Sequence, residues 1–467
     1  MTRTSERAWV GAAALAVAAS RFLLRARTVG SYDAIGFLRG IQHFDVARLQ
    51  PHFPGYPVYV ALARAARAFG LSPLDAATLI SALMAGVTTL AVWRLGRALG
   101  GRAGGACATG LYAGAALPWL LGGAPLPEST AVAFGAWAFA LLVDPERARP
   151  AAGAVCAALM LGARPDYAPL ALSWLLVALF VVERDRAALR RAAILGPLAI
   201  CAWLLPLTAL VGPARLFALG RTHLAGHFEA WGGSIATRPG LGLRASAFVR
   251  DLFFDGLAPN RALLAALVTL ILAALLWRAR RGGWSRAGKV ALLVAAPYAL
   301  WVFFGQNVIE QPRHLLPLVV MLLVGLGALL GAQPVFAVTA IALVGLASAP
   351  LVRERVRSVP AALQAARYVE AHYPPDQVVV FGAKSIRFFE WAAPEVPTRT
   401  RTWLSEVDVD LERLDRLPPH VLVTDELTPD PARAARLGAP ITFCRDPRLD
   451  RARPCLSLRP YQIGVAR

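Results

Sequence analysis

Charged residues are scarce in this sequence, and acidic residues are the scarcest. The 467 residues include 29 Asp and Glu and 49 Lys and Arg, so only 17% are charged, against about 25% in a typical soluble domain. Hydrophobic residues make up 57%, and the mean hydropathy is +0.52. This composition excludes an ordinary soluble protein and predicts a membrane protein, provided that the apolar residues form runs of about 20.

Cysteine is also scarce, with five residues, and no pair has the spacing of a zinc site. Cys107, Cys156 and Cys201 lie in apolar segments, where cysteine behaves as a small apolar residue. Cys444 and Cys455 lie eleven positions apart near the C-terminus. An oxidising compartment would allow these two to form a disulfide, and free thiols are the alternative.

The apolar residues do fall into long runs. About eleven are found, at 8–24, 76–93, 103–122, 128–143, 151–163, 167–182, 192–211, 262–277, 288–304, 314–330 and 335–350. Basic residues follow the first run, rather than the small residues of a signal-peptide cleavage site, so we interpret it as a span. The predicted fold class is an α-helical polytopic membrane protein with about eleven transmembrane helices.

Basic residues between the spans predict the orientation. Sixteen Lys and Arg lie in the connections on the N-terminal side of the membrane, and two lie in the short loops on the other side. The positive-inside rule therefore places the N-terminus in the cytoplasm and the long loops 25–72 and 212–260 outside. We expect a multi-pass protein of the cytoplasmic membrane. Its net charge of +20 suits an anionic lipid surface and requires no nucleic-acid partner.

Two domains are expected. Residues 1–350 form the transmembrane domain, whose long outer loops contain amphipathic helical segments. In residues 351–467 helical and strand patterns alternate, which predicts a small extracytoplasmic α/β domain on the periplasmic or extracellular side. That region contains no phosphate-binding glycine motif, and the chain shows no internal repeat, which argues mildly against an inverted-repeat transporter.

Ionisable residues gather at the outer ends of the spans, and such residues at membrane depth tend to mark function. The candidates are Asp33, Glu128, Arg164, Asp166, Arg313 and His314. A carboxylate can take a proton from an acceptor hydroxyl, a second acid can hold a divalent cation, and an arginine can grip a phosphate. This combination suits a lipid-phosphate-linked substrate.

Each candidate also has a structural interpretation. Asp33 could cap a helix, Glu128 could be a first-turn acid stabilised by the helix dipole, and Arg313 could anchor its span at the lipid surface. Arg164 and Asp166 could form a simple interfacial ion pair. His223 and His227 have helical spacing, but no accompanying zinc motif, so we expect them on a solvated helix face. Asp251 and Asp255 are expected to be loop charges.

The stretch "QPHFPGYPVY" at 50–59 is unusually rigid and aromatic. Pro54 and Pro57 fix the backbone angle φ, and Gly55 permits a tight turn. Tyr56 and Tyr59 suit the headgroup region, where the rings are buried and the hydroxyls are wet. The stretch could form the wall of a cavity or lock the loop in place.

With Asp33 in "SYD" ahead of it, this stretch resembles the GT-C superfamily of polytopic glycosyltransferases that use polyprenyl-phosphate sugars. The resemblance is greatest to bacterial relatives of the protein O-mannosyltransferases with an H-P-P-G-Y-P-L-Y-type motif. The chain matches at His52, at 54–57 and at Tyr59, but has Phe53 in place of the first proline. The "QPRHLLPLVV" stretch at 311–320 and the closing α/β domain are similar to such enzymes too.

The resemblance implies roles for individual residues. Asp33 would be the catalytic base or would orient the acceptor, and Arg313 would contact the donor phosphate. Glu128 would be a weaker candidate for a metal-binding second acid. Asp33 is followed by Ala34 rather than by another acid, so a Mg²⁺ or Mn²⁺ requirement is an open question. The predicted substrate-binding residues are His52, Tyr56, Arg164, Asp166, Arg313 and His314.

The predicted function is inverting transfer of a monosaccharide, a hexose or pentose, from a polyprenyl-phosphate donor to a glycan, lipid or protein acceptor. Membrane lipids are expected partners. A transporter or flippase of lipid-linked intermediates is one alternative, although the spans are mostly Ala, Leu, Val and Gly, and polarity gathers at one face. A non-catalytic subunit in envelope assembly is another.

Overall fold

The computed structural model describes residues 3–143, 148–180, 186–279, 286–414 and 416–463. The chain divides into two compact units. The larger unit is Met1–Ala26 with Phe37–Val356, and the smaller is Arg27–Gly36 with Arg357–Arg467. The smaller unit therefore takes in a short segment from the beginning of the chain as well as the C-terminal region.

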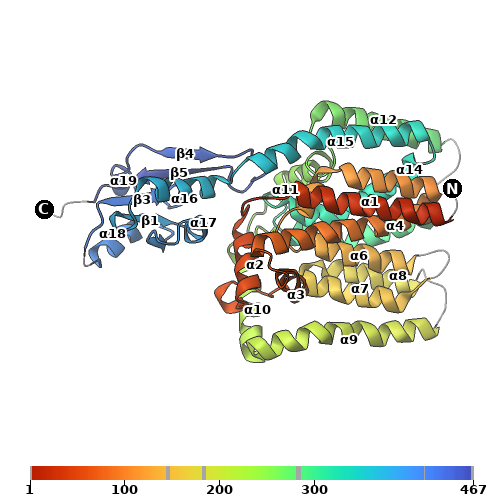
Figure 1. Cartoon of the computed structure of the whole chain (residues 1–467), viewed down its shortest axis with the longest axis horizontal. Helices are drawn as coiled ribbons and strands as arrows, with labels where there is room; N and C mark the ends of the chain where they lie inside the picture. The colour runs from red at the N-terminus through yellow and green to blue at the C-terminus, as the bar shows by residue number, and fades with distance from the viewer. Residues whose placement is uncertain (1–2, 144–147, 181–185, 280–285, 415, 464–467) are drawn as a thin grey trace. The chain divides into compact units, whose positions relative to one another are not determined.

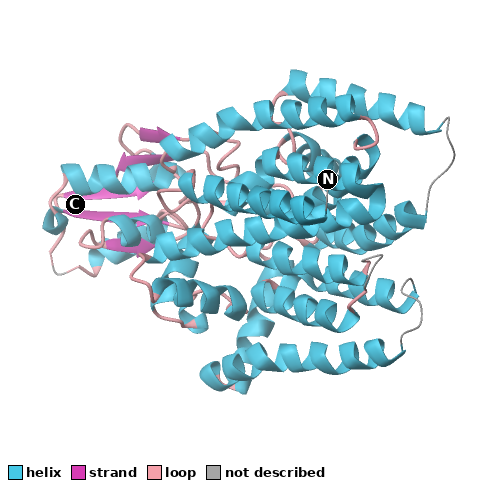
Figure 2. Ribbon diagram, turned by 45° about the vertical axis from the view of Figure 1, so that its right-hand side comes forward, coloured by secondary structure: helices cyan, strands magenta, loops and turns pink. Residues whose placement is uncertain are grey.

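The larger unit is helical, with its long helices side by side (Figures 1 and 2). Within the described residues, each predicted span falls on a helix. The helices are α1 (Arg3–Leu23), α3 (Pro57–Arg67), α4 (Pro73–Gly114), α5 (Ala116–Gly122), α6 (Glu128–Leu142), α7 (Pro150–Ala163), α8 (Ala168–Phe180), α9 (Arg186–Val211), α10 (Pro213–Glu229), α11 (Leu241–Val249), α12 (Arg261–Ala279), α13 (Arg286–Gly305), α14 (Leu316–Leu330) and α15 (Pro334–Arg357), with α2 (Tyr32–Gln42) crossing the boundary between the units.

Four helical stretches of the described residues are long and apolar enough to cross a membrane: Pro73–Gly114, Arg186–Val211, Pro312–Leu330 and Pro334–His372. Five shorter apolar helices accompany them: Glu128–Leu142, Pro150–Ala163, Pro165–Leu179, Arg261–Leu275 and Val294–Gly305. These helices and the small C-terminal sheet confirm the predicted fold class, a polytopic helical membrane protein with a C-terminal α/β domain.

Helix α4 contains the predicted span 76–93 and the first part of the predicted span 103–122, and a kink separates the two. Gly100 and Gly101 have non-helical backbone angles inside it, as expected where two glycines interrupt a helix. A side chain at Gly100 would clash, because its Cβ would lie 2.6 Å from the Cα of Ala328 in α14. Small residues thus let α4 and α14 approach closely, which is how helices commonly associate in membranes.

The smaller unit has a five-stranded mixed sheet in the order β2-β1-β3-β5-β4. The strands are β1 (Val378–Gly382), β2 (Thr398–Thr400), β3 (His420–Thr424), β4 (Ile441–Cys444) and β5 (Cys455–Pro460), and the helices are α16 (Ala361–His372), α17 (Ile386–Ala392), α18 (Ser405–Glu412) and α19 (Pro431–Ala434). The strands β2, β1 and β3 are parallel, and β5 is antiparallel to β3 and β4. Cys444 and Cys455 face each other in β4 and β5 and form a disulfide.

Residues 27–36 complete the smaller unit. The guanidinium of Arg387 lies 4.3 Å from the ring centroid of Tyr32, a distance at which cation and ring attract. The hydroxyl of Ser31 accepts a hydrogen bond from the backbone N–H of Ala34 at 3.2 Å and so caps α2. Asp33 is therefore not the cap that one interpretation of the sequence suggested, but the second residue of the helix.

Candidate functional site

The proline-rich stretch at 50–59 forms a tight turn into α3. Gly55 has φ of +93°, and a Cβ there would lie 2.9 Å from the Cζ of Phe44, so glycine is required by both conformation and space. Tyr56, just before Pro57, also has a positive φ of 49°, and such strain is often found at functional sites. Its hydroxyl lies 2.8 Å from the Nε2 of His52, so these two predicted binding residues form a pair.

A second group forms where the helices α6, α7 and α14 end or begin. Arg164 follows α7 with an extended backbone, ahead of the short 3-10 helix η2 (Pro165–Tyr167). Its side chain is turned back into the protein, and the residue is 4% exposed. The guanidinium donates to Asp166 Oδ2 from Nε at 3.1 Å and from Nη2 at 3.0 Å, and it also donates to Glu128, the first residue of α6.

The 3-10 helix η4 (Pro312–Leu315) adds two more of the predicted residues. Arg313 Nε lies 3.4 Å from Glu128 Oε1, and His314 Nδ1 lies 3.1 Å from Arg164 Nη2. The hydroxyl of Tyr298 donates to the backbone oxygen of His314 at 2.8 Å and fixes this turn. We call Glu128, Arg164, Asp166, Arg313 and His314 together the Arg164 cluster.

Electrostatics hold the Arg164 cluster together. Burial lowers the pKa of Arg164, but the nearby charges of Asp166 and Glu128 outweigh it and raise the pKa well above its usual value. Arg164 therefore stays charged, and two arginines balance two carboxylates in the cluster. Glu128 is fully buried and Arg164 nearly so, whereas the side chains of Asp166 and Arg313 remain 23% and 15% exposed. A substrate can reach these last two.

The surroundings of Glu128 do not suit a divalent cation. Both Arg164 and Arg313 lie on its carboxylate, and their positive charges would repel a metal ion. Among the described residues, no group of three or more His, Cys, Asp or Glu side chains could hold a metal. Glu128 is better placed to hold the two arginines than to bind Mg²⁺ or Mn²⁺.

Asp33 lies apart from these residues along the chain, in the first turn of α2 and within the segment 27–36 of the smaller unit. Its side chain is partly exposed. Its place on the outer side of the membrane and its catalytic role both stay predictions.

Two other predictions from the sequence were wrong. His223 and His227 are half-buried rather than solvated, since the ring of His223 stacks on His52 with centroids 6.0 Å apart. His227 Nε2 lies 2.7 Å from the backbone oxygen of Gly305. Asp251 and Asp255 are buried rather than exposed loop charges. Charge and spacing alone gave no sign of these contacts, which come from segments far apart in the chain.

Sequence reasoning also missed Tyr167 and Tyr298, which support the Arg164 cluster. Their rings meet edge to face with centroids 5.3 Å apart, and the guanidinium of Arg164 lies 5.4 Å from the Tyr167 centroid. Tyr167 directly follows Asp166, so its place in the sequence was a usable signal. Tyr298 lies inside an apolar span, where the only signal in the sequence was that polar groups are rare in such a segment.

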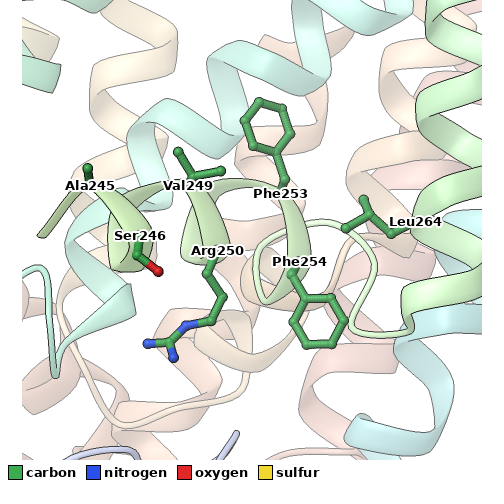
Figure 3. A pocket seen from close by; sticks show the side chains of 7 residues that line it. All are labelled: Ala245, Ser246, Val249, Arg250, Phe253, Phe254 and Leu264. Atoms are coloured by element: carbon green, nitrogen blue, oxygen red, sulfur yellow. The ribbon is translucent and has the colours of Figure 1, made fainter. Parts of the chain in front are cut away.

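An apolar cavity of about 510 Å³ is lined by residues of α11, of α12 and of the turn between them. The π-helix η3 (Arg250–Phe254), which forms part of its wall, packs against η4, and π-helical turns are frequent at functional sites. The cavity is lined by Ala245, Ser246, Val249, Arg250, Phe253, Phe254 and Leu264. Figure 3 shows the polar groups of Ser246 and Arg250 on one side of the turn, and the ring of Phe253 pointing away from them.

Comparison with known proteins supports the fold. No family model and no curated protein sequence matches the chain. Two crystal structures of ArnT from Cupriavidus metallidurans do match. The one bound to undecaprenyl phosphate has a TM-score of 0.57 and 14% identity, over 100% of this chain and 99% of that chain. The apo state has a TM-score of 0.56 and 12% identity, over 98% of each chain.

The apo form of the oligosaccharyltransferase from Archaeoglobus fulgidus is a further match. Its TM-score is 0.51 at 14% identity, over 89% of this chain and 69% of that one. Identities this low carry the fold and not the activity. The likeness in fold to ArnT covers the whole chain. The protein has the fold of the ArnT and oligosaccharyltransferase structures.

Proposed function

We propose that the protein is a membrane glycosyltransferase that moves one monosaccharide from a polyprenyl-phosphate donor to an acceptor on the outer face of the cytoplasmic membrane. The observation that carries the proposal is the Arg164 cluster, in which a buried ion network holds the partly exposed guanidinium of Arg313 on η4, and η3, which lines an apolar cavity, packs against η4. A phosphate with an apolar tail matches this pair of features. The match to an ArnT structure bound to undecaprenyl phosphate supports the same donor class.

In this proposal Arg313 binds the donor phosphate. The glycosidic bond between the sugar C1 and the phosphate oxygen breaks, and its electron pair leaves with the polyprenyl phosphate. The positive charge of Arg313 is worth most at that moment, because negative charge grows on the phosphate as the bond breaks. Glu128 and Arg164 are too buried to touch the donor. They hold Arg313 and His314 in position, and Asp166 orients the sugar.

The acceptor hydroxyl attacks C1 from the face opposite the phosphate, which inverts the configuration. Its proton passes to the carboxylate of Asp33, which acts as general base. His52 and Tyr56 form a hydrogen-bonded pair that can contact the sugar hydroxyls. The local charges argue against a metal, so no step is assigned to one.

The apolar cavity lined by η3 suits the prenyl chain of the donor. Valine, leucine and two phenylalanines supply most of its wall, and burial of prenyl carbons there would contribute affinity in proportion to the apolar area removed from water. Arg250 at its edge is paired with Asp251 and Asp255.

The test is transfer of radiolabelled sugar from a panel of polyprenyl-phosphate monosaccharides to cell-envelope extract, using the full-length protein in lipid nanodiscs. We expect Asp33→Asn to lower the rate by about 10²–10⁴-fold, the usual loss of a general base. Asp376→Asn, which makes the same charge change on an exposed turn, is the matched control and should leave the rate unchanged. Equal rates for wild type and Asp33→Asn would remove Asp33 from the mechanism. Absence of transfer from every donor would overturn the proposed function.

A further inference from the structure

Helix α10, in the second long loop, carries a cavity of about 380 Å³ that the proposed transfer step does not use. Arg221, Thr222 and Glu229 line it from the helix, and Trp231 closes it just after the helix ends. The cavity therefore combines a large aromatic ring with a cation, a hydroxyl and a carboxylate. Binding sites for small polar molecules commonly pair an apolar surface with a few placed polar groups.

The indole of Trp231 is held in place from two directions. The ring of His223 meets it with centroids 5.0 Å apart, and that of His227 at 5.9 Å, both edge to face. It also lies flat against the helix at Gly226, where a Cβ would come within 2.2 Å of its Nε1. Even so, 52% of Trp231 is exposed. A rigid ring with so much open surface can stack on a ligand at little cost in conformational entropy.

The charged groups beside the indole are available to a ligand. Within the part of the chain that the structure describes, neither Arg221 nor Glu229 has an ion-pair partner, and both are exposed. Arginine offers only donors and glutamate only acceptors, so together they can bind hydroxyl groups, which do both. A sugar ring has the matching form, with C–H groups on its face and hydroxyls around its edge.

We propose that this cavity binds a saccharide unit, and that the acceptor of the transfer reaction is a glycan held by one of its sugars at Trp231. The role of the bound sugar as acceptor rests on the proposed function, whereas saccharide binding itself does not. Two contacts join the cavity to the candidate site. His223 stacks on His52, the partner of Tyr56, and His227 binds the backbone of Gly305, seven positions before Pro312 of η4.

An anchor in the membrane surface is the other possible use of an exposed tryptophan. The arrangement of α10 argues against it. Phe217, Leu224 and Phe228 are exposed and fall on one stripe by their spacing of seven and four residues. That stripe is the apolar face suited to lipid, and Trp231 lies outside it, against the side of the helix that carries Gly226.

The test measures saccharide binding by full-length protein in fluorescent nanodiscs on an array of short oligosaccharides. Wild type should bind at least one oligosaccharide, and Trp231→Ala should weaken that binding about tenfold or more, with Trp231→Phe retaining most of it. Gly226→Ala should also weaken it, because the new methyl displaces the indole without removing it. Leu224→Ala, on the apolar stripe of the same helix, is the control and should bind as wild type does.

The outcomes separate this proposal from the function on which it partly rests. Loss of array binding in Trp231→Ala with no transfer activity in wild type would support the saccharide site and count against the donor assignment. If transfer is observed, Trp231→Ala should raise the acceptor KM and leave kcat nearly unchanged. No binding to any oligosaccharide, or equal binding by Trp231→Ala, would overturn the proposal.

Discussion

Two buried arginines of the larger unit, Arg164 and Arg244, are almost equally hidden from solvent but have opposite surroundings. Arg244, in α11, donates to three backbone oxygens, those of Phe303, Gly233 and Gln306, at 2.6–2.8 Å. Burial lowers its pKa, whereas the carboxylates around Arg164 raise that of Arg164. Depth alone therefore does not mark a functional arginine. An arginine that donates to backbone carbonyls holds segments of the chain together. An arginine that contacts ionisable side chains sets the local distribution of charge.

The most direct test of this difference between Arg164 and Arg244 is to remove the charge of Arg164. We expect Arg164→Ala to destabilise the protein by about 3–5 kcal/mol, because it leaves buried Glu128 without its main partner. The measurement is the unfolding midpoint of the full-length protein in detergent. Replacing both partners, Arg164→Met with Glu128→Met, should recover most of the stability and none of the transfer activity. A stable Arg164→Ala variant would show that the cluster is not a coupled network.

Substitution of Arg313 should lower the transfer rate strongly and change the stability little. Arg313→Ala is expected to lower the transfer rate by about 10²–10³-fold, the usual cost of removing one group that stabilises a developing charge. The unfolding midpoint should change little, since Arg313 is at the partly exposed edge of the cluster. Arg313→Lys keeps the charge but not the forked geometry, so its transfer rate should lie between those of wild type and Arg313→Ala. A rate within threefold of wild type would exclude Arg313 as the phosphate ligand.

Substitution of Arg244 should instead lower the stability more than it lowers the transfer rate. Arg244→Ala removes three hydrogen bonds to backbone oxygens and leaves those oxygens buried, which we expect to cost about 2–3 kcal/mol. Hydrogen exchange should quicken in 233–238 and 303–307, the two segments that Arg244 joins. The transfer rate should fall less than in Arg313→Ala. Unchanged exchange in these segments would mean that the three bonds do not hold them together.

Asp450 in the smaller unit extends the comparison to a half-buried carboxyl whose pKa is set more by burial than by the nearby charges of Arg445 and Arg453. Burial raises its pKa to about 6, although the backbone N–H of Arg453 donates to it at 3.2 Å. The folded state therefore holds this proton more tightly than the unfolded state does. The stabilisation is complete below about pH 4 and is lost as pH rises through about 6.

The stabilisation that protonated Asp450 contributes is about 2 kcal/mol. This is the free energy that a pKa difference of about two units gives, reduced for screening by solvent. Asp450→Asn should make the stability of the smaller unit nearly independent of pH in this window. Pulse proteolysis of full-length protein at pH 5 and pH 7 measures it. Equal pH dependence in wild type and variant would assign the titration to another group.

The sequence predicted the parts of the molecule that depend on local pattern. Long apolar runs have to become helices in a membrane, because every backbone group needs a partner there, and the ionisable residues at their ends stood out against that background. The pairing of these residues could not be predicted. Arg164 and His314 are 150 positions apart, and only the folded bundle brings them together. The strands β2, β4 and β5 were missed for the same reason, since each is defined by its pairing with another strand.

Helix α2 also limits where the chain can be truncated or divided into domains. Its first residues belong to the smaller unit and its remainder to the larger, and the ring of Tyr32 packs under Arg387. The C-terminal domain is thus not a module that can be deleted or exchanged on its own. A truncation at residue 357 would strip the segment around Asp33 of the side chains on which it folds, and a graft onto a relative would have to carry residues 27–36 with it.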